Sequence, residues 1–296
     1  MLPFYKKYRI FYFVIGFTVF LITIIRFLPI ECEIFGQTLY YRGLIGKKVF
    51  VNDFVAAYIK VILMFIGMPL ILRFTLDIFV RREYLAVLNI FQNECNPELF
   101  ITRHYPVFEK IRKRRKNKFS YLMSPFIAHA QALFEKGDVE EAISILEELN
   151  QNKYLDKRSC SVSKYASYLS LYRYYWFIGN TEDAARCREV LEATFEKHGT
   201  SIYRMYGKFD NLFSQKTSAL DHLCRKEYRE ALGLYLDLLK KSSTNYEKAY
   251  LNCFIATIYD AIGEPENSAT YLETAEALAP KFFFVTETKR RINEKD

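Results

Sequence analysis

The sequence predicts an all-α protein in which a two-helix transmembrane hairpin precedes an α-solenoid of stacked helix pairs. Three observations lead to this prediction. Two long apolar runs lie within the first 82 residues, a strongly basic segment follows them, and helical periodicity broken by polar turns fills residues 119–296. We therefore divide the chain into a membrane hairpin at 1–82, a helical, basic juxtamembrane linker at 83–118 and a cytoplasmic helical domain at 119–296.

The first predicted span covers residues 10–28 and contains one charged residue, Arg26, near its end. At about 1.5 Å per residue, a helix of this length covers about 28 Å, close to the roughly 30 Å of a bilayer's hydrocarbon core. A cleaved signal peptide is the alternative, because Lys6, Lys7 and Arg9 precede the run. We favour an uncleaved span, since the run is longer than the usual signal-peptide core of about 7–15 residues and no small-residue cleavage site follows it.

The second predicted span covers residues 54–72, and its Lys60 can extend toward the lipid headgroups. Basic residues flank both spans on the side away from the loop at 31–53, and the charges within that loop balance. The positive-inside rule then predicts a multi-pass protein of the cell membrane with both termini in the cytoplasm. Within the external loop, the glycine-punctuated β-branched and aromatic runs of residues 34–51 indicate a small β-hairpin.

The positive charge of the chain is local. The chain has 42 Lys and Arg residues against 34 Asp and Glu residues, and much of the excess falls in one segment just before the helical domain. The residues that we expect to contact anionic lipid there are Lys110, Arg112, Lys113, Arg114, Arg115, Lys116 and Lys118. Each basic residue near such a surface gains about 1 kcal/mol. A solvated basic face is the second interpretation, and nucleic-acid binding is the least favoured one.

The residue types of known catalytic and metal sites lack the required spacing. The six cysteines are at least 27 residues apart, and the four histidines have no ligand spacing to each other or to cysteine. No phosphate-binding loop, dinucleotide fingerprint, zinc-protease motif or nucleophile elbow occurs. We therefore expect no enzyme, no catalytic residue, no metal and no cofactor. Cys32, in the external loop, is interpreted as an interface residue, with pairing between chains or a modification as alternatives.

Four polar turns recur in the helical domain: KGDVEEA at 136–142, GNTEDAA at 179–185, KEYREAL at 226–232 and GEPENSA at 263–269. Each lies between an aromatic-rich helix and an acidic helix start, where carboxylates complement the helix dipole. Gly137, Gly179 and Gly263 supply the left-handed residue that commonly ends a helix. The turns therefore predict four helix pairs.

The residues around these turns resemble the tetratricopeptide repeat family, which has small residues at positions 8 and 20 and glycine near position 15. The matching residues in the first and last repeats are Ala130, Leu133, Gly137, Ala142 and Leu146, and then Ala256, Tyr259, Gly263, Leu272, Ala275 and Pro280. Tyr172, Arg188 and Lys226 depart from the pattern, and the turns are 42, 47 and 37 residues apart instead of about 34. A generic array of α-hairpins is the alternative. Residues 83–112 suggest one more degenerate pair, broken at Asn96–Pro97, and a last helix at 282–294 is expected to cap the stack.

The resemblance implies an inner groove lined by the first helix of each pair. Its exposed positions would be Gln131, Glu135, Arg173, Phe177, Lys216, Leu220, Thr257 and Asp260. Ile127 replaces the lysine with which some family members hold a C-terminal carboxylate, so a chaperone-tail clamp is disfavoured. The resemblance implies a membrane-anchored adaptor or scaffold that binds a peptide or protein segment. The alternative is an accessory or sensory subunit of a membrane transport or secretion complex, acting through its transmembrane hairpin.

Overall fold

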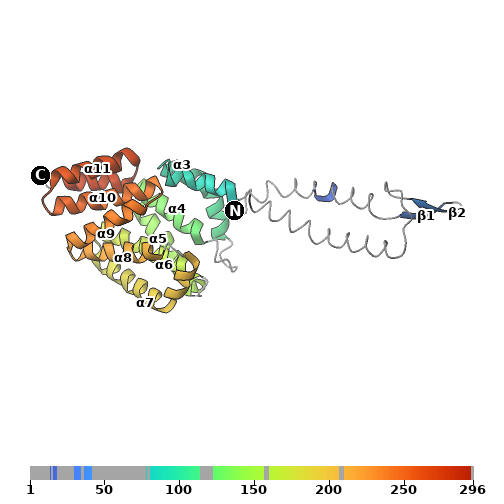
Figure 1. Cartoon of the computed structure of the whole chain (residues 1–296), viewed down its shortest axis with the longest axis horizontal. Coiled ribbons are helices and arrows are strands. Elements are labelled where there is room, and N and C mark those ends of the chain that lie inside the picture. Colours follow the sequence, from blue (N-terminus) through green and yellow to red (C-terminus); the bar gives the residue numbers. More distant parts are fainter. Residues whose placement is uncertain are drawn as a thin grey trace. The chain divides into compact units, whose positions relative to one another are not determined.

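The computed structural model describes residues 14, 16–18, 30–34, 37–41, 78, 81–113, 123–156, 160–206 and 210–294. The chain divides into two compact units, Met1–Leu85 and Ala86–Asp296. Figure 1 labels the strands β1 and β2 and the helices from α3 to α11.

The first unit contains a two-stranded antiparallel sheet made of β1 (Ile30–Ile34) and β2 (Gln37–Tyr41). Ile30 is opposite Tyr41, and Ile34 is opposite Gln37. The hairpin predicted in the external loop is therefore present, although it begins four residues before the predicted segment and ends at Tyr41.

The two predicted spans fall almost entirely outside the described residues. Only residues 14 and 16–18, all helical, lie within the first span, and none lies within the second. Across the described part of the chain, no helix is both long enough and apolar enough to cross a bilayer. The transmembrane hairpin thus stays a prediction from the sequence.

The second unit is a helical array. A helical stretch that ends at residue 92 leads, after a short break, into α3. The helices are α3 (Pro97–Lys113), α4 (Met123–Lys136), α5 (Val139–Asn150), α6 (Ser161–Phe177), α7 (Thr181–Tyr206), α8 (Asp210–Cys224), α9 (Tyr228–Lys241), α10 (Asn245–Ala261), α11 (Pro265–Leu278) and α12 (Phe283–Asn293), with the 3-10 turn η2 (Lys153–Asp156) before α6. The predicted break at Asn96–Pro97 is confirmed, since the Asn96 side chain accepts a hydrogen bond from the Leu99 amide at the start of α3.

All four predicted turns join the two helices of a pair. Gly137, Gly179 and Gly263 have φ angles of +102°, +80° and +79°, which glycine adopts without a Cβ clash. The fourth turn has Lys226 at the equivalent position with φ of +61°, a conformation that a side chain disfavours. The Lys226 amide donates to the Leu223 carbonyl at 3.0 Å, which helps hold this turn closed. The helix pairs α4–α5, α6–α7, α8–α9 and α10–α11 follow from these turns.

Small side chains lie where the two helices of a pair approach each other. Ala130 of α4 and Ala142 of α5 are fully buried, and the corresponding alanines of α8 and α9 are buried as well. In the last pair, the Ser268 hydroxyl donates to the Ala256 carbonyl at 2.9 Å, so a serine replaces the expected alanine without an unpaired buried hydroxyl. The irregular spacing of the turns has a local cause, since α7 is 26 residues long and η2 lengthens the connection before α6.

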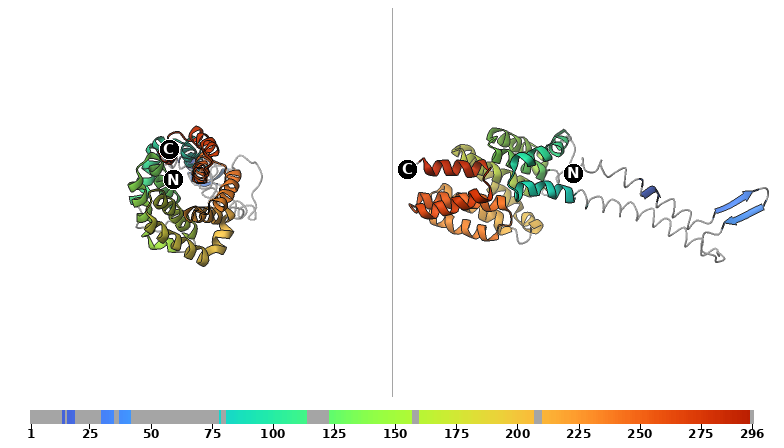
Figure 2. Two further views of the ribbon diagram at one scale, coloured as in Figure 1. Left: turned by 90° about the vertical axis from the view of Figure 1, so that its left-hand side faces the viewer. Right: turned by 90° about the horizontal axis from the view of Figure 1, so that it is seen from above.

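The array closes on itself because its last helix returns to its first pair. Helix α12 packs against α4 and α10 as well as against α11. The Phe284 amide donates to Glu135 Oε2 at 3.4 Å, and the Phe284 ring stacks on Tyr250 with 4.0 Å between centroids. Viewed end-on, the helices of the second unit form a ring (Figure 2).

A second contact joins the two ends of the array. The Asn245 side chain, at the start of α10, donates to the Asn93 carbonyl at 2.8 Å. The ring of Phe91 lies 4.8 Å from that of Tyr246 and 5.8 Å from that of Phe282. The prediction that the last helix only caps the stack was therefore incomplete. The phenylalanines at the start of α12 contact rings from several helices, whereas a helix that only caps a stack contacts the last pair alone.

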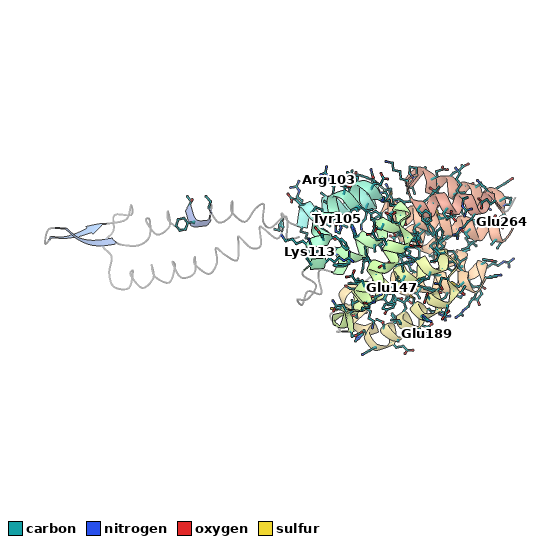
Figure 3. All side chains as sticks on the ribbon, turned by 180° about the vertical axis from the view of Figure 1, so that it is seen from behind. Arg103, Tyr105, Lys113, Glu147, Glu189 and Glu264 are labelled. Carbon is teal, nitrogen blue, oxygen red and sulfur yellow. The ribbon has the colours of Figure 1, made fainter. Side chains whose placement is uncertain are left out.

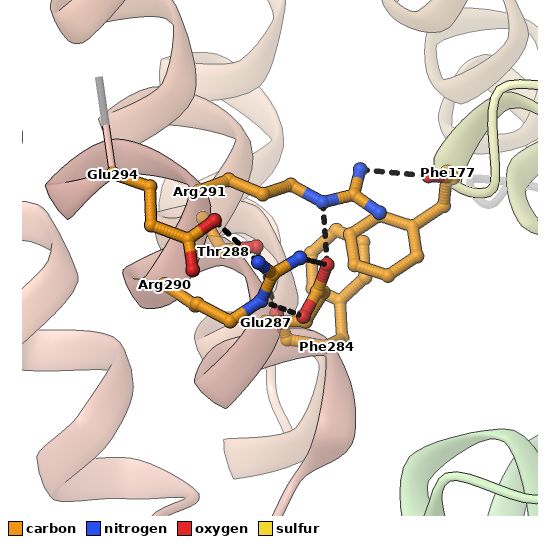
Figure 4. Close-up of polar contacts among 7 residues, drawn as sticks. All are labelled: Phe177, Phe284, Glu287, Thr288, Arg290, Arg291 and Glu294. Atoms are coloured by element: carbon orange, nitrogen blue, oxygen red, sulfur yellow. Dashed lines mark hydrogen bonds and ion pairs between the residues drawn. The ribbon is translucent and has the colours of Figure 1, made fainter.

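Helix α12 is held by an ion-pair network as well as by its aromatic residues. Glu287 accepts hydrogen bonds from Arg290 and Arg291, and these bonds lower its pKa to about 2. Arg291 also donates to the Phe177 carbonyl at 2.7 Å, with its guanidinium 4.3 Å above the Phe177 ring (Figure 4). This network links α12 to the end of α6.

Candidate functional site: a cavity on the inner face of the helical array

A cavity of about 300 Å³ lies among the first helices of the pairs, and we call it the inner cavity. Its lining comes chiefly from α4, α6, α8 and α10. Among the side chains that line it are Gln131, Arg173, Lys216, Leu220, Tyr246 and Tyr250. Polar groups thus face this space together with aromatic and aliphatic walls.

Four of the eight predicted groove residues line this cavity together: Gln131, Arg173, Lys216 and Leu220. The Gln131 amide donates to the Ser170 hydroxyl at 3.3 Å, which joins α4 to α6. Lys216 of α8 pairs with Glu247 of α10. The predicted register therefore brings side chains from three helices, far apart in sequence, to one place.

The other four predicted residues are placed differently. Glu135 and Phe177 are buried, with 1% and 4% of their surface exposed, because α12 covers the positions that an open groove would expose. The Thr257 hydroxyl donates to the Cys253 carbonyl within its own helix at 2.9 Å, and neither it nor Asp260 lines the inner cavity. The predicted exposure of Glu135 and Phe177 is thus corrected, and the groove is shorter than expected.

Arg173 is the central charged group of the inner cavity. Its guanidinium lies 4.7 Å from the Tyr250 ring centroid, within the range of a cation–π contact. Burial opposes its charged form, but the neighbouring tyrosines and Glu135 raise the pKa of Arg173, so it remains a cation. Among the described residues, no carboxylate forms an ion pair with Arg173, and its Nε–H has no hydrogen-bond partner.

Glu135 lies beside Arg173 and is buried. Burial raises the pKa of the Glu135 carboxyl to about 8, although the Phe284 amide and Arg173 act in the opposite direction. The carboxyl is therefore mostly protonated at neutral pH. Its Oε1 has no hydrogen-bond partner among the described residues.

Helix α10 contributes residues that the sequence analysis did not select. Tyr250 is buried, lines the inner cavity, and has a hydroxyl with no hydrogen-bond partner in the described part of the chain. Tyr246 and Phe254 line the same space, one helical turn to either side. Burial raises the pKa of both tyrosines above the ordinary range. In the sequence, Tyr246, Tyr250 and Phe254 are four residues apart, and this spacing places all three on one face of a helix.

A second buried polar cluster lies between α3 and α4. His104 Nδ1 and His129 Nδ1 are 3.3 Å apart, so one ring donates and the other accepts. Phe100 stacks on His104 at 4.7 Å and Phe108 on His129 at 4.0 Å. Burial lowers the pKa of both histidines well below the ordinary value; His129 lowers the pKa of His104 further, and Arg112 lowers that of His129 further. The pair is therefore neutral near pH 7, and no sequence spacing suggested it.

The basic segment is described only at its start. Lys110, Arg112 and Lys113 lie in the last turn of α3, where basic residues also complement the helix dipole. Figure 3 labels Lys113. Arg112 pairs with Glu148 of α5, and Lys113 pairs with Glu109, both at 2.7 Å. Arg114, Arg115, Lys116 and Lys118 lie outside the described residues.

Comparisons with known proteins identified no relative of this chain. The chain matches no family model, and no curated protein or solved structure is similar to it. Within the described ranges, no group of three or more His, Cys, Asp or Glu side chains is arranged to hold a metal ion.

Proposed function

We propose that this protein is a membrane-anchored adaptor that binds a peptide or protein segment on the inner face of its helical array. The observation that supports it best is the inner cavity, on which Gln131, Arg173, Lys216 and Leu220 converge from three helices. Stacked helix pairs build a continuous curved surface, and such surfaces commonly serve as binding sites. The resemblance of the turns and small-residue positions to tetratricopeptide repeats favours the same function.

Membrane attachment is the second part of the proposal. It rests on the two apolar runs at 10–28 and 54–72 and on the basic residues that flank them. The array would then lie on the cytoplasmic side, with the basic segment near anionic lipid. A local array held at a membrane raises the effective concentration of its partner there. We propose no catalytic role, since the motifs that would carry one are not in the sequence.

Site-specific photo-crosslinking in the full-length protein tests the binding surface. A photoreactive amino acid replaces Gln131, which lines the inner cavity, or Glu264, which is exposed in the turn before α11 (Figure 3). We expect a discrete adduct from position 131 and none from position 264. The crosslinked protein, once identified and purified, should bind the wild type directly and lose binding to Leu220→Trp, which fills the cavity. Equal adducts from both positions would remove the inner face from the proposal.

Vesicle binding tests the basic segment separately. Residues 86–296 should bind vesicles that contain phosphatidylserine and leave them as salt rises, because the attraction acts within about 8 Å at physiological ionic strength. Replacing Arg112, Lys113, Arg114 and Arg115 with glutamine should abolish binding. Replacing Lys240 and Lys241 of α9 with glutamine is the control and should leave it intact. Equal binding to neutral vesicles would contradict an electrostatic contact.

An accessory or sensory subunit is the second candidate function, and the β1–β2 hairpin favours it. This element lies in the loop that is expected outside the membrane, where an adaptor needs no ordered structure. Exchange of residues 1–80 for an unrelated two-span hairpin separates the two candidates. An adaptor keeps its partner after the exchange, whereas an accessory subunit loses it.

A further inference from the structure

The β1–β2 hairpin has the minimum number of strands for a sheet. In the described part of the chain the sheet has two strands, so β1 and β2 each pair with one neighbour (Figure 1). In an antiparallel pair, alternate residues direct their backbone N–H and C=O groups to the neighbour, and the residues between them direct theirs away. Each strand thus presents backbone donors and acceptors on its outer edge. An isolated two-stranded hairpin is marginally stable in water, so pairing with a further strand would stabilise this element.

The two edges of the hairpin differ in charge. Strand β1 has the sequence IECEI, in which Glu31 and Glu33 flank Cys32, whereas β2 has the sequence QTLYY and contains no charged residue. Charged side chains on an edge strand, and like charges opposite each other, oppose pairing with another strand. Strand β2 contains no proline or glycine either. The edge of β2 is therefore the one that favours an added strand.

The sequence of β2 is suited to pairing with a second copy of itself. An antiparallel β2–β2 pair centred on Leu39 places Leu39 opposite Leu39 and Thr38 opposite Tyr40. No like charges meet, and a β-branched residue opposite an aromatic one is a favourable cross-strand pair. The corresponding β1–β1 pair would place Glu31 opposite Glu33 twice. Pairing of β1 with β2 of a second copy would leave an open edge at each end and continue as a chain of copies.

We infer that two copies of this chain associate through the edges of their β2 strands and form one four-stranded antiparallel sheet. The strand order is β1, β2, β2 and β1, with the twofold axis at Leu39. The arrangement is closed, because each copy uses the same edge and the strands that carry glutamates lie outermost. The inference goes beyond both candidate functions, since it concerns the first unit and assigns no partner to the inner cavity. A failure of one therefore leaves the other standing.

This arrangement fixes the distances between equivalent residues of the two copies. The Cα atoms of the two Leu39 residues would lie about 4.5–5.5 Å apart, within the range that a disulfide spans. The two Cys32 residues lie in the outer strands, three strand spacings or about 14 Å apart. The two Tyr41 residues are on β2 but lie about 13 Å apart along the strand direction. Neither Cys32 nor a cysteine at position 41 should therefore pair between copies.

Cysteine crosslinking of the full-length protein in detergent tests the arrangement, with copper phenanthroline and oxygen as the oxidant. Every variant carries Cys224→Ser, because Cys224 is the exposed cysteine among the described residues. Leu39→Cys, combined with Cys32→Ser, should rapidly form a disulfide-linked dimer. The matched controls are the native Cys32 and Tyr41→Cys with Cys32→Ser, which should crosslink at least about tenfold more slowly because of their separation. Slow crosslinking at position 39, or equal rates at a control position, would overturn the inference.

Native mass spectrometry of the full-length protein, released from detergent, measures the association itself. The wild type should be a dimer. Leu39→Lys should be a monomer, because it places two ammonium groups opposite each other at the twofold axis. Ile34→Lys puts the same charge on β1, away from the axis, and should leave the dimer intact.

Three results of this measurement would contradict the inference. A monomeric wild type would leave lipid or another protein as the neighbour of the hairpin. A dimer that survives Leu39→Lys would place the contact elsewhere in the chain. Dissociation of both lysine variants would assign the contact to a face of the sheet instead of the β2 edge. If Leu39→Lys prevents the hairpin from forming, the crosslinking rate of Leu39→Cys, a smaller change, still decides between the outcomes.

Discussion

The array contains two buried polar clusters, and they meet the cost of burial in different ways. Between α3 and α4, His104 and His129 bond to each other and are covered by aromatic rings on both sides. At the centre of the ring, Arg173 and Tyr250 keep donors without partners beside a cavity. The first cluster is a neutral pair packed between aromatic rings, whereas the second contains the cation Arg173 and lies beside a cavity. Burial therefore shifts the pKa values in the two clusters in different directions.

Helix α4 links the two clusters, because it carries both His129 and Glu135. Burial shifts the pKa values of the histidines and of Glu135 in opposite directions, so protonation of the two groups has opposite effects on stability. Burial lowers the pKa of the histidines and raises that of Glu135. The pH dependence of stability therefore distinguishes the clusters experimentally.

The histidine pair should give the largest effect. A histidine with a lowered pKa in the folded state binds its proton mainly when unfolded, so its contribution to stability is lost as pH falls below about 6.5. The expected loss is about 1.4 kcal/mol per pH unit for each ring. Urea denaturation of residues 86–296 at pH 7 and pH 5 measures it. The double variant His104→Gln, His129→Gln should lose this dependence, and His222→Gln should keep it. An unchanged slope in the double variant would mean that the pair is not buried neutral.

Glu135 should give the next largest effect, with the opposite sign. The folded carboxyl keeps its proton up to about pH 8, whereas the unfolded one loses it near pH 4.5. Its contribution to stability is therefore complete at low pH and declines by about 1.4 kcal/mol per unit as pH rises between these values. Glu135→Gln should remove this decline in the same denaturation assay. The exposed Glu140→Gln is the control, and an identical decline in both variants would exclude Glu135 as the cause.

The third prediction concerns the packing of α4 against α5. Ala142 of α5 is fully buried in the closely packed α4–α5 pair, so Ala142→Leu overpacks the contact and should cost about 1–3 kcal/mol. A lower melting temperature of residues 86–296 would measure this cost. Ala185→Leu, at an exposed alanine near the start of α7, should leave the melting temperature nearly unchanged. Equal effects from the two changes would argue against the close packing of α4 on α5 at Ala142.

A substitution of Gly137, just after the end of α4, should have the smallest effect on stability. Gly137 has a left-handed φ of +102°, and an added Cβ atom would lie 3.6 Å from the ring of Phe283, an ordinary contact. Gly137→Ala should therefore cost about 1–2 kcal/mol through backbone strain alone. Gly233→Ala is the matched control, because Gly233 lies within α9 with open space around it, and alanine there should stabilise by up to about 1 kcal/mol. Calorimetric melting of the two variants should show shifts of opposite sign.

The sequence was sufficient for local structure. Each turn carries a glycine or a polar residue at the left-handed position, and three of the helix pairs have small residues at their closest contact, whereas α6–α7 has Tyr172 there, so the four pairs could be predicted from their turns. These signals lie within one pair of helices. The convergence of Gln131, Arg173 and Lys216 also follows from the register, since the first helices of successive pairs line the inner face.

The sequence was insufficient for closure of the ring. Contact of Phe284 with Glu135 joins residues that are 149 positions apart, and no local pattern encodes such a pairing. Glu135 and Phe177 were therefore expected to be exposed. One signal was available in the run Phe282, Phe283 and Phe284, because a terminal helix that only caps a stack needs a polar outer face.

Closure also changes how the array should come apart. In an open solenoid each repeat contacts only its neighbours, so the ends fray first and unfolding spreads inward. Here the Asn93–Asn245 contact joins the segment before α3 to α10, and the Glu135–Phe284 contact joins α4 to α12, so both ends of the array are held. The array should therefore unfold in one cooperative transition, with a steep denaturant dependence and slow amide exchange shared by α4 and α10.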